Sequence, residues 1–282
     1  MISILVTGAN GQLGRCLQDV AKGTKDLEWS FKTSKELDIS NKELLENLFK
    51  NQKFDYVVNC AAYTAVDEAE SDIEKAFLVN AEAVQYLASC CKKNNSTFIH
   101  ISTDFVFDGK SSTPYNEDDE VGPINVYGKS KLKGEEYVKQ LLDEYFIIRT
   151  SWVYSEYGNN FVKTMLRLGK ERDELSIVSD QIGSPTYAGD LAAVIFEIIS
   201  SGSKKYGVYH YSNEGEISWF EFAKAIFEES NLNIKLLPIK SEFYPTPAKR
   251  PQFSVMNKLR IKNKLNIEDS PWRDSLKEFL LK

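Results

Sequence analysis

The chain has 282 residues, of which 42% are hydrophobic and 12% aromatic, and its formal net charge is −6. This length and composition exclude a disordered chain and predict a globular protein with room for one large domain and a smaller lobe. The negative charge, without a basic stripe interleaved with aromatic residues, argues against a nucleic-acid partner. No apolar run reaches the length of a membrane span, so we expect no membrane association.

The chain contains four cysteines and two histidines, which are Cys16, Cys60, Cys90, Cys91, His100 and His210. None of the cysteines belongs to a C-x-x-C pair, and the histidines add no metal-ligand spacing. We therefore expect no metal site. Free thiols indicate a reducing compartment, so the expected location is the cytoplasm.

Short apolar runs alternate with helical stretches over the first half of the chain. Strands are predicted at residues 2–6, 27–31, 56–60, 97–102 and 146–150, and helices at 8–22 (after a turn), 41–50, 73–93 and 126–143. Nearly continuous apolar strands separated by helices are typical of a parallel sheet covered on both faces. The right-handed crossover rule then predicts an α/β fold with a Rossmann-like doubly wound parallel sheet.

The pattern becomes irregular beyond residue 150. Helices are expected at 187–200 and 219–230, and the stretch GVYHYSN is a strand that can rejoin the sheet. A proline-rich loop, FYPTPAKRP, follows the last of these helices. We expect residues 1–150 to form the nucleotide-binding domain, with 175–212 returning to it, and residues 151–174 and 213–282 to form a smaller C-terminal substrate-binding lobe.

A glycine-rich turn, TGANGQLG, follows the first strand and begins the first helix. Gly8, Gly11 and Gly14 allow a tight turn and close approach of a pyrophosphate, whose charge the helix N-terminus stabilises. The spacing is G-x-x-G-x-x-G, and the alternative is a structural turn. We expect this segment to bind a dinucleotide through Gly8, Asn10, Gly11, Gln12, Leu13 and Gly14.

The end of the second strand bears on the choice of nicotinamide cofactor. It reads FKTSKELD and carries Lys32 and Lys35, where an acidic residue would favour the ribose of NAD. Basic and hydroxylated side chains suit the additional phosphate of NADPH. The alternative is that both lysines only face solvent. We expect NADPH, with NADH as the second choice, and we expect Asp38 and Ile39 to lie along the adenine.

Two later strand ends should meet the cofactor, because ligands gather beyond the carboxyl ends of parallel strands. The third strand runs into NCAAYT, where Ala61 and Ala62 allow close approach of the cofactor and Tyr63 follows. The alternative is that these alanines only pack against a helix. The fourth strand ends at STDF, which places Thr103 and its hydroxyl where a substrate carbonyl can accept a hydrogen bond.

Tyr127 and Lys131 stand four residues apart near the start of a predicted helix. At roughly 100° per residue, Lys131 lies about 40° around the helix from Tyr127, while Lys129 and Lys133 project to the opposite side. A phenol with a pKa of about 10 exchanges protons poorly near neutrality, and a neighbouring ammonium lowers that pKa. We expect Tyr127 to be a proton donor, with Lys131 lowering its pKa and binding the cofactor ribose. A solvated, lysine-rich helix face is the alternative.

Seven stretches carry a further pattern: AAYTAVDEAE, STDFVFDG, YGKSKLKGE, RTSWVYSEYGNNFVKTML, SDQIGSPTYAGDLA, YHYSNEGEISWFEFAKAI and PTPAKRPQFSVM. In this order they resemble the extended short-chain dehydrogenase/reductase family, and within it the reductases of nucleotide-linked 4-ketosugars. The resemblance covers essentially the whole chain. Thr103, Tyr127 and Lys131 stand in the places of the family's catalytic Ser/Thr–Tyr–Lys group.

The resemblance implies NAD(P)H-dependent reduction of the 4-keto group of dTDP-4-dehydro-L-rhamnose to dTDP-L-rhamnose, a precursor of cell-surface polysaccharide. It also implies that Asn80 belongs to the cofactor site. The substrate-binding residues that it implies are Thr64, Val66, Thr103, Asp104, Trp152 and Arg250. Without the resemblance, Trp152 is equally a packing residue at a domain junction and Arg250 a surface arginine.

One departure from the family concerns magnesium. Some members carry a glutamate after the last glycine of the turn, where it helps to form a magnesium-bridged dimer, and this chain has Cys16 there. The departure argues against a bound magnesium ion. A homodimer that lacks the magnesium bridge is still compatible with the sequence.

Other functions within the fold stay open. A dehydratase would need a base where Phe105 follows Asp104, which argues against dehydration. An epimerase, a reductase of another nucleotide-linked 4-ketosugar, and a non-catalytic NADP-binding regulatory subunit remain as alternatives.

Overall fold

The computed structural model describes residues 1–282 and is built on a six-stranded parallel sheet with the order β10-β5-β4-β3-β1-β2. Its strands are β1 (Ile2–Thr7), β2 (Leu27–Lys32), β3 (Tyr56–Asn59), β4 (Thr97–Thr103), β5 (Tyr145–Thr150) and β10 (Gly207–His210). The chain runs outward from β1 to β2 and then returns to build the other side from β3 onward. The predicted doubly wound α/β fold is confirmed.

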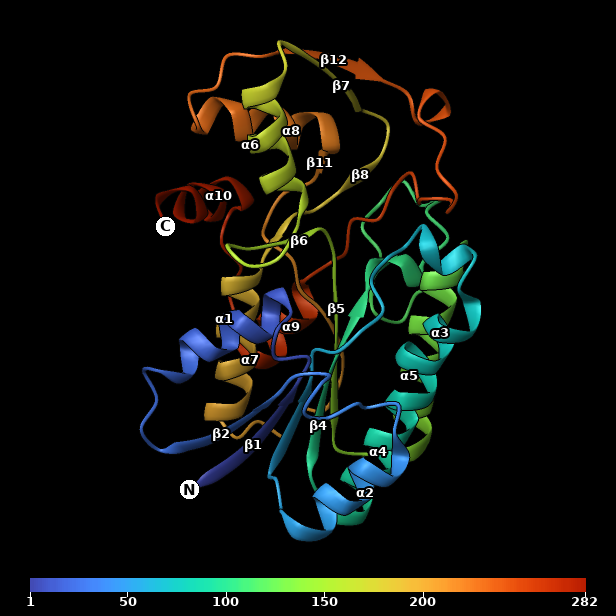
Figure 1. The fold of residues 1–282 in the computed structure, drawn as a ribbon, viewed down its shortest axis with the longest axis vertical. Helices are drawn as coiled ribbons and strands as arrows, with labels where there is room; N and C mark the ends of the chain where they lie inside the picture. Colours follow the sequence, from blue (N-terminus) through green and yellow to red (C-terminus); the bar gives the residue numbers. More distant parts are fainter.

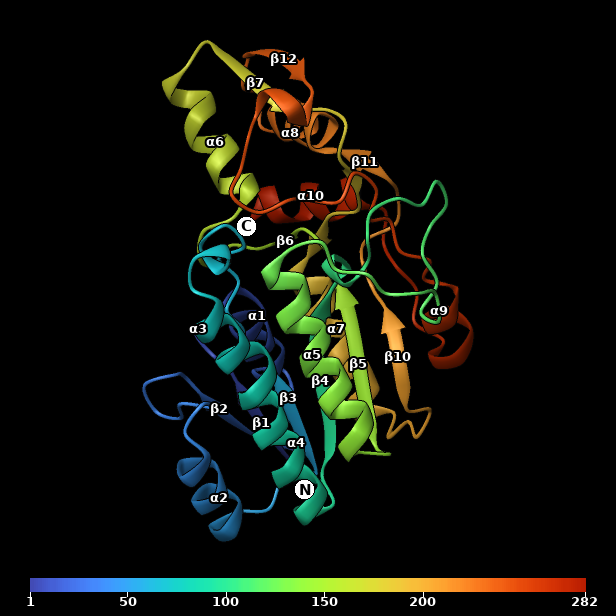
Figure 2. The same cartoon turned by 90° about the vertical axis from the view of Figure 1, so that its right-hand side faces the viewer.

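Helices cover both faces of this sheet (Figures 1 and 2). One face carries α1 (Gln12–Ala21), α7 (Ala188–Ser200) and α9 (Leu259–Leu265), and the other carries α2 (Lys42–Asn51), α4 (Ala83–Asn94) and α5 (Val126–Leu141). Side chains alternate along each strand, so Ile4 and Val6 pack in one core and Leu5 in the other. The long helix expected at 73–93 is α3 (Ile73–Phe77), a π turn η2 (Leu78–Glu82) and α4 in succession.

The second lobe lies above the carboxyl ends of the strands, at the top of Figure 1. It contains α6 (Phe161–Glu171), β7 (Glu174–Val178), α8 (Trp219–Glu229), β12 (Lys235–Ile239) and α10 (Trp272–Leu281) around a core of its own. The remaining elements are short: β6 (Val153–Tyr154), β8 (Ile182–Gly183), β9 (Thr186–Tyr187), β11 (Ile217–Ser218), and the 3-10 turns η1 (Glu68–Glu70), η3 (Asp104–Val106) and η4 (Ser241–Phe243).

The division between the lobes differs in two places from the expected boundaries. Strand β7 pairs with β12, and its Leu175 and Ile177 pack in the upper core, so the return to the sheet begins only with α7. Conversely, Ile261 and Ile267 around α9 join the sheet core. The physical reason is that the edge strand β10 needs apolar cover, which this late segment supplies.

The structure also bears on two expectations drawn from composition. All four cysteines are free thiols, three of them buried and Cys60 partly exposed. No helix is both long enough and apolar enough to cross a lipid bilayer.

Candidate active site

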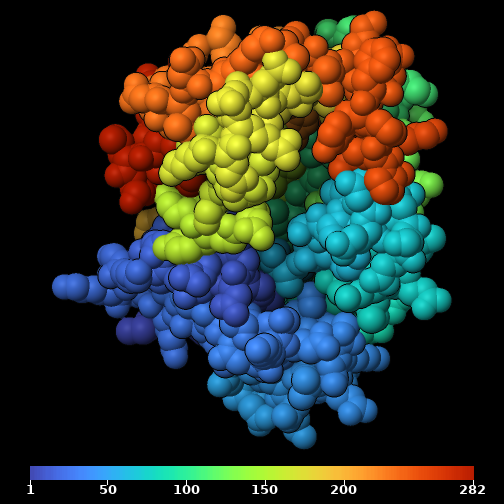
Figure 3. Space-filling view, turned by 45° about the horizontal axis from the view of Figure 1, so that its top comes forward, coloured from blue at the N-terminus to red at the C-terminus, as the bar shows by residue number.

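A cleft of about 600 Å³ lies where the carboxyl ends of β1, β3, β4 and β5 face the upper lobe. Figure 3 shows its mouth as a hollow between α6 in yellow, the orange segment near residue 245 and the cyan segment near residue 70. Most of the site residues expected from the sequence line it: Asn10, Gly11, Gln12, Leu13, Ala62, Thr64, Val66, Thr103, Asp104, Tyr127, Lys131, Trp152 and Arg250.

A second hollow, of about 710 Å³, lies away from these strand ends. Its charged residues neutralise one another, since Lys258 and Lys262 both form ion pairs with Glu214 and with the buried Asp269. None of the expected catalytic residues lines it, so the candidate active site is the first cleft.

The glycine turn is shaped for close contact with the third strand. Gly8 has a φ of 69°, and a Cβ added there would lie 2.5 Å from the backbone nitrogen of Ala61, so only glycine fits. Helix α1 follows with Gly11 as its N-cap and no side chain capping its first N–H groups. These free donors, together with the helix dipole, form a site suited to a pyrophosphate.

Gln12 connects this turn to the upper lobe. Its Oε1 accepts hydrogen bonds from Ser155 Oγ at 3.0 Å and Asn160 Nδ2 at 2.9 Å, and its Nε2 donates to the Val153 carbonyl at 3.3 Å. The side chain expected to contact the cofactor therefore also holds the loop between β6 and α6.

Eight of the expected cofactor residues do not line the cleft: Gly8, Gly14, Lys32, Asp38, Ile39, Ala61, Tyr63 and Asn80. Three of them, Lys32, Asp38 and Ile39, lie at the end of β2 and beyond it. The Lys32 carbonyl accepts the Ala9 N–H at 3.1 Å, which keeps this strand end beside the glycine turn. Asp38 is exposed and accepts hydrogen bonds from Ser40, whereas Ile39 is buried in the core. The Lys32 side chain is partly exposed.

Asn80 holds the loop that follows β3. Its Oδ1 accepts the Tyr63 N–H at 2.8 Å, and its Nδ2 donates to the Tyr63 carbonyl and to Ser130 Oγ, both at 3.0 Å. The residue is fully buried and does not line the cleft. By bonding both backbone groups of Tyr63, Asn80 holds in place the segment that contains Ala61, Ala62 and Thr64.

Thr103 and Asp104 form the polar end of β4. The Thr103 hydroxyl donates to Asp104 Oδ1 at 3.0 Å and accepts the Phe105 N–H at 3.1 Å. Burial raises the pKa of Asp104 to about 6, with hydroxyl groups of Ser254 and Thr103 opposing the rise. Its second oxygen, Oδ2, is buried without a hydrogen-bond partner, so this carboxyl has capacity for a ligand hydroxyl.

Helix α5 brings Tyr127 to the same place. Asn125 caps the helix by accepting the Gly128 N–H at 2.7 Å. A Cβ added at Gly128 would lie 2.2 Å from the Phe105 carbonyl oxygen, so this glycine lets the helix start press against the end of β4. The Tyr127 ring meets the edge of Phe105 at 5.8 Å and lines the cleft.

Of the three lysines after Tyr127, only Lys131 is buried, as the helical phase predicts. Its Nζ donates to the Ile101 carbonyl at 2.6 Å, and burial lowers its pKa to about 8. The pKa of Tyr127 is raised to about 12 by burial, with the Thr103 hydroxyl acting in the opposite direction. The expected lowering of this pKa by Lys131 is therefore wrong for this arrangement, because the Lys131 ammonium is directed at the Ile101 carbonyl and burial raises the pKa of the phenol.

Two tryptophans form one wall of the cleft. Trp152 and Trp219 stack with ring centroids 3.5 Å apart and an angle of 11° between their planes. Trp152 adopts a φ of 47°, a left-handed backbone that is strained for a bulky residue. The ring lies against Gly183, where an added Cβ would be 2.7 Å from it. This packing keeps the Trp152 indole at the cleft.

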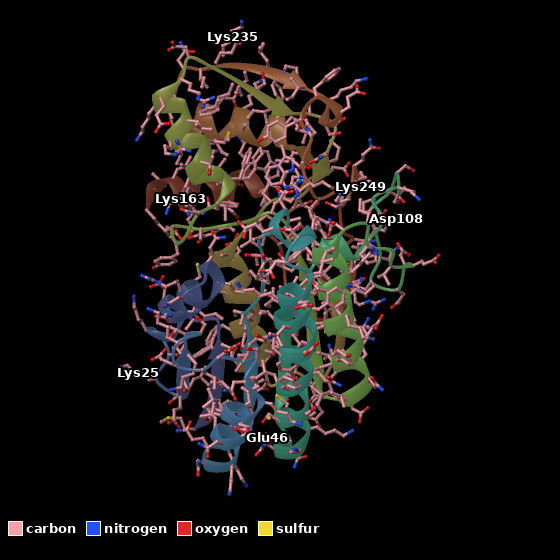
Figure 4. All side chains as sticks on the ribbon, turned by 45° about the vertical axis from the view of Figure 1, so that its right-hand side comes forward. Lys25, Glu46, Asp108, Lys163, Lys235 and Lys249 are labelled. Carbon is pink, nitrogen blue, oxygen red and sulfur yellow. The ribbon has the colours of Figure 1, made fainter.

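Arg250 closes the far side of the cleft. Its Nη1 and Nη2 donate to the two carboxylate oxygens of Asp67 at 3.0 and 2.6 Å, and Nη1 also donates to the Ala248 carbonyl. This ion pair joins the proline-rich loop of the upper lobe to the segment after Val66. In Figure 4, Lys163 on α6 lies to the left and Lys249, the neighbour of Arg250 in the chain, to the right, both in the upper lobe.

Sequence reasoning missed several residues that line the cleft: Cys60, Ile101, Phe105, Thr150, Ser151, Val153, Gly158, Asn159, Leu191 and Trp219. The strand-end rule, applied to the fifth strand, would have found Thr150 and Ser151. Trp219 begins α8 behind a capping box formed by Ser218 and Glu221, which is a helix-start signal. No local signal places this tryptophan beside Trp152.

Comparisons with known proteins agree with this geometry. The family model described as "RmlD substrate binding domain" matches residues 2–282. A dTDP-4-dehydrorhamnose reductase of Aggregatibacter actinomycetemcomitans is 44% identical, over 98% of this chain and 98% of its own length. The spore coat polysaccharide biosynthesis protein SpsK of Bacillus subtilis is 42% identical, over 99% and 97%. A crystal structure of dTDP-4-dehydrorhamnose reductase from Bacillus anthracis in complex with NADP superposes with a TM-score of 0.95 at 41% identity, covering 100% of this chain and 99% of that one.

Proposed function

Since this chain belongs to the RmlD substrate-binding-domain family, within the extended short-chain dehydrogenases/reductases, we propose that it is a dTDP-4-dehydrorhamnose reductase. It reduces the 4-keto group of dTDP-4-dehydro-L-rhamnose to give dTDP-L-rhamnose, a nucleotide-sugar precursor of cell-surface polysaccharide. The observation that carries the proposal is the convergence of Thr103, Tyr127 and Lys131 on one cleft beside an uncapped glycine turn.

The nicotinamide cofactor, when bound, supplies the hydride that is added to C4 of the sugar. Gly8, Gly11 and the free N–H groups of α1 hold its pyrophosphate. The hydroxyl of Tyr127 gives a proton to the oxygen on C4 as charge develops there, and Thr103 donates a hydrogen bond to the same oxygen. Lys131 binds the cofactor ribose and holds positive charge near the phenolate that Tyr127 becomes.

Asp104, Trp152, Thr64, Val66 and Arg250 hold the nucleotide sugar. The unpartnered Oδ2 of Asp104 accepts a sugar hydroxyl, and the indole of Trp152 packs on the apolar face of the ring. The guanidinium of Arg250 binds the diphosphate in exchange for part of its contact with Asp67.

NADPH is the proposed cofactor, with NADH as the alternative. The NADP complex of the Bacillus anthracis relative and the position of Lys32 beside the glycine turn support this choice. No magnesium is proposed: Cys16, which stands where some relatives carry a glutamate, is buried, and sulfur is a poor ligand for Mg²⁺, which prefers oxygen. Activity should therefore survive treatment with EDTA. The four free thiols support a cytoplasmic location, and a homodimer without a metal bridge stays compatible with the chain.

The test is turnover of dTDP-4-dehydrorhamnose, formed in situ, with NADPH and NADH absorbance followed separately. Tyr127→Phe should lose most turnover and still bind cofactor. Tyr137→Phe, on the same helix and packed under Lys133, is the matched control and should keep wild-type turnover. Oxidation of neither cofactor would refute the proposal. NADPH binding without oxidation by any nucleotide-linked ketosugar would indicate a regulatory subunit, and turnover only with another such sugar would indicate a different reductase.

A further inference from the structure

A line of buried polar groups runs from Lys131 into the sheet, away from the cleft. Lys131 Nζ lies 3.5 Å from His100 Nε2, and His100 Nδ1 lies 3.1 Å from Asn59 Nδ2. Asn59 Oδ1 then accepts the Thr7 hydroxyl at 2.7 Å. Thr7, Asn59 and His100 are at most 1% exposed, and the assigned functions of the cleft use none of them.

The backbone fixes the direction of these hydrogen bonds. The Ala61 N–H, which can only donate, points at Asn59 Oδ1 from 3.2 Å. The carboxamide must therefore present its oxygen to Ala61 and Thr7 and its NH₂ group to His100. Because an NH₂ group only donates, His100 Nδ1 must accept. A neutral imidazole with an accepting Nδ1 carries its proton on Nε2, the nitrogen that faces Lys131.

His100 also stays neutral. Its ring is fully buried and stacks on Phe98 at 5.9 Å, and burial, followed by the charge of Lys131, lowers its pKa well below the ordinary value. Two donors thus face each other: an imidazole N–H and the lysine ammonium. The amine form of Lys131 can accept from that N–H, whereas the ammonium form cannot.

Other charged groups near Lys131 also affect how strongly its ammonium form is stabilised. On α5 the Glu135 carboxylate favours its ammonium, while Arg149 on β5 neutralises much of Glu135 by pairing with it. The Cys60 thiol at the end of β3 adds no charge, because burial raises its pKa and keeps it neutral. The Ile101 carbonyl is the one hydrogen-bond acceptor that the ammonium meets in the protein. The imidazole N–H therefore faces a lysine whose charge is only weakly stabilised.

We propose that His100 is a positioning residue for Lys131: the fixed Nε2–H of His100 keeps the Lys131 ammonium directed at the Ile101 carbonyl and the cleft. The same N–H cannot accept a hydrogen bond from the ammonium, so it should also favour loss of the Lys131 proton. The proposal rests on the proposed function, because it needs Lys131 to act in catalysis. Because burial lowers the pKa of Lys131 and raises that of Tyr127, we expect loss of the Lys131 proton to set the alkaline limb of activity.

The tautomer can be measured directly in the intact protein. The chain has only two histidines, so ¹⁵N-histidine labelling gives two imidazoles, and His210→Gln identifies the signals of His100. The expected result is a neutral His100 with its proton on Nε2 from pH 6 to pH 10. A proton on Nδ1, or an imidazolium in this range, would overturn the proposal. This measurement needs no substrate, so it stands whether or not the protein is a reductase.

The second arm compares pH profiles of kcat. His100→Phe keeps an aromatic ring on Phe98 and removes the N–H, so the alkaline limb should move up by about half to one pH unit. Phe98→Leu disturbs the same packing and leaves the N–H in place, so its limb should not move even if the protein is less stable. An unmoved limb in His100→Phe, or an equal shift in Phe98→Leu, would show a packing role only and contradict the proposal.

Discussion

Arg149 and Glu135 form a bidentate ion pair inside the protein, one helical turn from Lys131. Arg149 Nε donates to Glu135 Oε1 at 2.9 Å and Nη2 to Oε2 at 2.8 Å, with side chains 1% and 0% exposed. Ser102 Oγ adds a third hydrogen bond to Oε1 at 2.6 Å. These contacts join α5 to the ends of β4 and β5, and they keep the pKa of Glu135 at about 2 although burial acts to raise it.

Removing one partner of this pair should be costly. Glu135→Gln leaves the Arg149 charge buried without its partner, and we expect a loss of about 3–5 kcal/mol in the free energy of unfolding. The control Glu136→Gln breaks only the exposed pair with Lys133 and should stay within about 0.5 kcal/mol of wild type. Urea denaturation measures both. Equal stability of the two variants would mean that the buried pair does not hold α5 in place.

The wall formed by Trp152 should be sensitive to one methyl group. Gly183→Ala places a Cβ 2.7 Å from the indole, so the ring must shift, and the KM for the sugar nucleotide should rise about tenfold. The dissociation constant of NADPH should not change. Gly23→Ala, whose Cβ would meet its nearest atom at 3.6 Å, serves as the control. A rise in NADPH dissociation constant equal to the rise in KM would instead indicate general damage to the cleft.

Asp104 should give stability a measurable pH dependence. Its pKa of about 6 in the folded protein exceeds the unfolded value of about 3.9. Between pH 4 and pH 6 the folded state keeps a proton that the unfolded chain has lost, so this carboxyl makes the protein less stable as pH rises. Asp104→Asn removes the effect and should gain up to about 3 kcal/mol relative to wild type from pH 4 to pH 7. Urea denaturation at several pH values tests it, and a constant difference would show that the carboxyl has an ordinary pKa.

Arg250 should matter for affinity more than for the chemical step. Arg250→Ala removes a charged donor for the diphosphate, and the KM for the sugar nucleotide should rise by roughly 10- to 100-fold with little change in kcat. Arg167→Ala breaks an exposed pair with Glu171 on α6 and should leave both parameters unchanged. Steady-state kinetics distinguish the two. If kcat falls and KM stays constant, Arg250 acts by holding the lobes through Asp67 and not by binding phosphate.

Lys32 should influence the choice of cofactor. Lys32→Ala should lower kcat/KM for NADPH by about tenfold or more and leave the value for NADH nearly unchanged, because only NADPH carries the additional phosphate. Lys25→Ala, at an exposed position in the loop before β2, is the charge-matched control. Equal losses with both cofactors would exclude a phosphate contact for Lys32.

The sheet and the polar ends of its strands could be predicted because their signals are local. Strand β4 reads as one apolar run that ends in Ser102 and Thr103, and the parallel-sheet rule places such ends at the cleft. Helical periodicity likewise separates Lys131 from its neighbours. These features depend on residues within a few positions of one another.

The remaining features depend on contacts between distant residues. Strands β6 and β8 have only two residues each, which is too short for a periodic signal. The Asp67–Arg250 pair joins residues 183 positions apart. The direction of the Tyr127 pKa depends on how deeply the phenol is buried, and that is known only when the upper lobe is in place.

The contacts of Gln12 limit how this protein can be redesigned. A chimera that exchanges the upper lobe at residue 150 for that of a relative would also exchange Val153, Ser155 and Asn160, all three of its hydrogen-bond partners. Such an exchange is meant to change only the preference for the sugar, but it would also change the surroundings of the glycine turn that binds the cofactor. A recombination that retains 153–160 with the N-terminal half would keep the turn intact and transfer sugar preference alone.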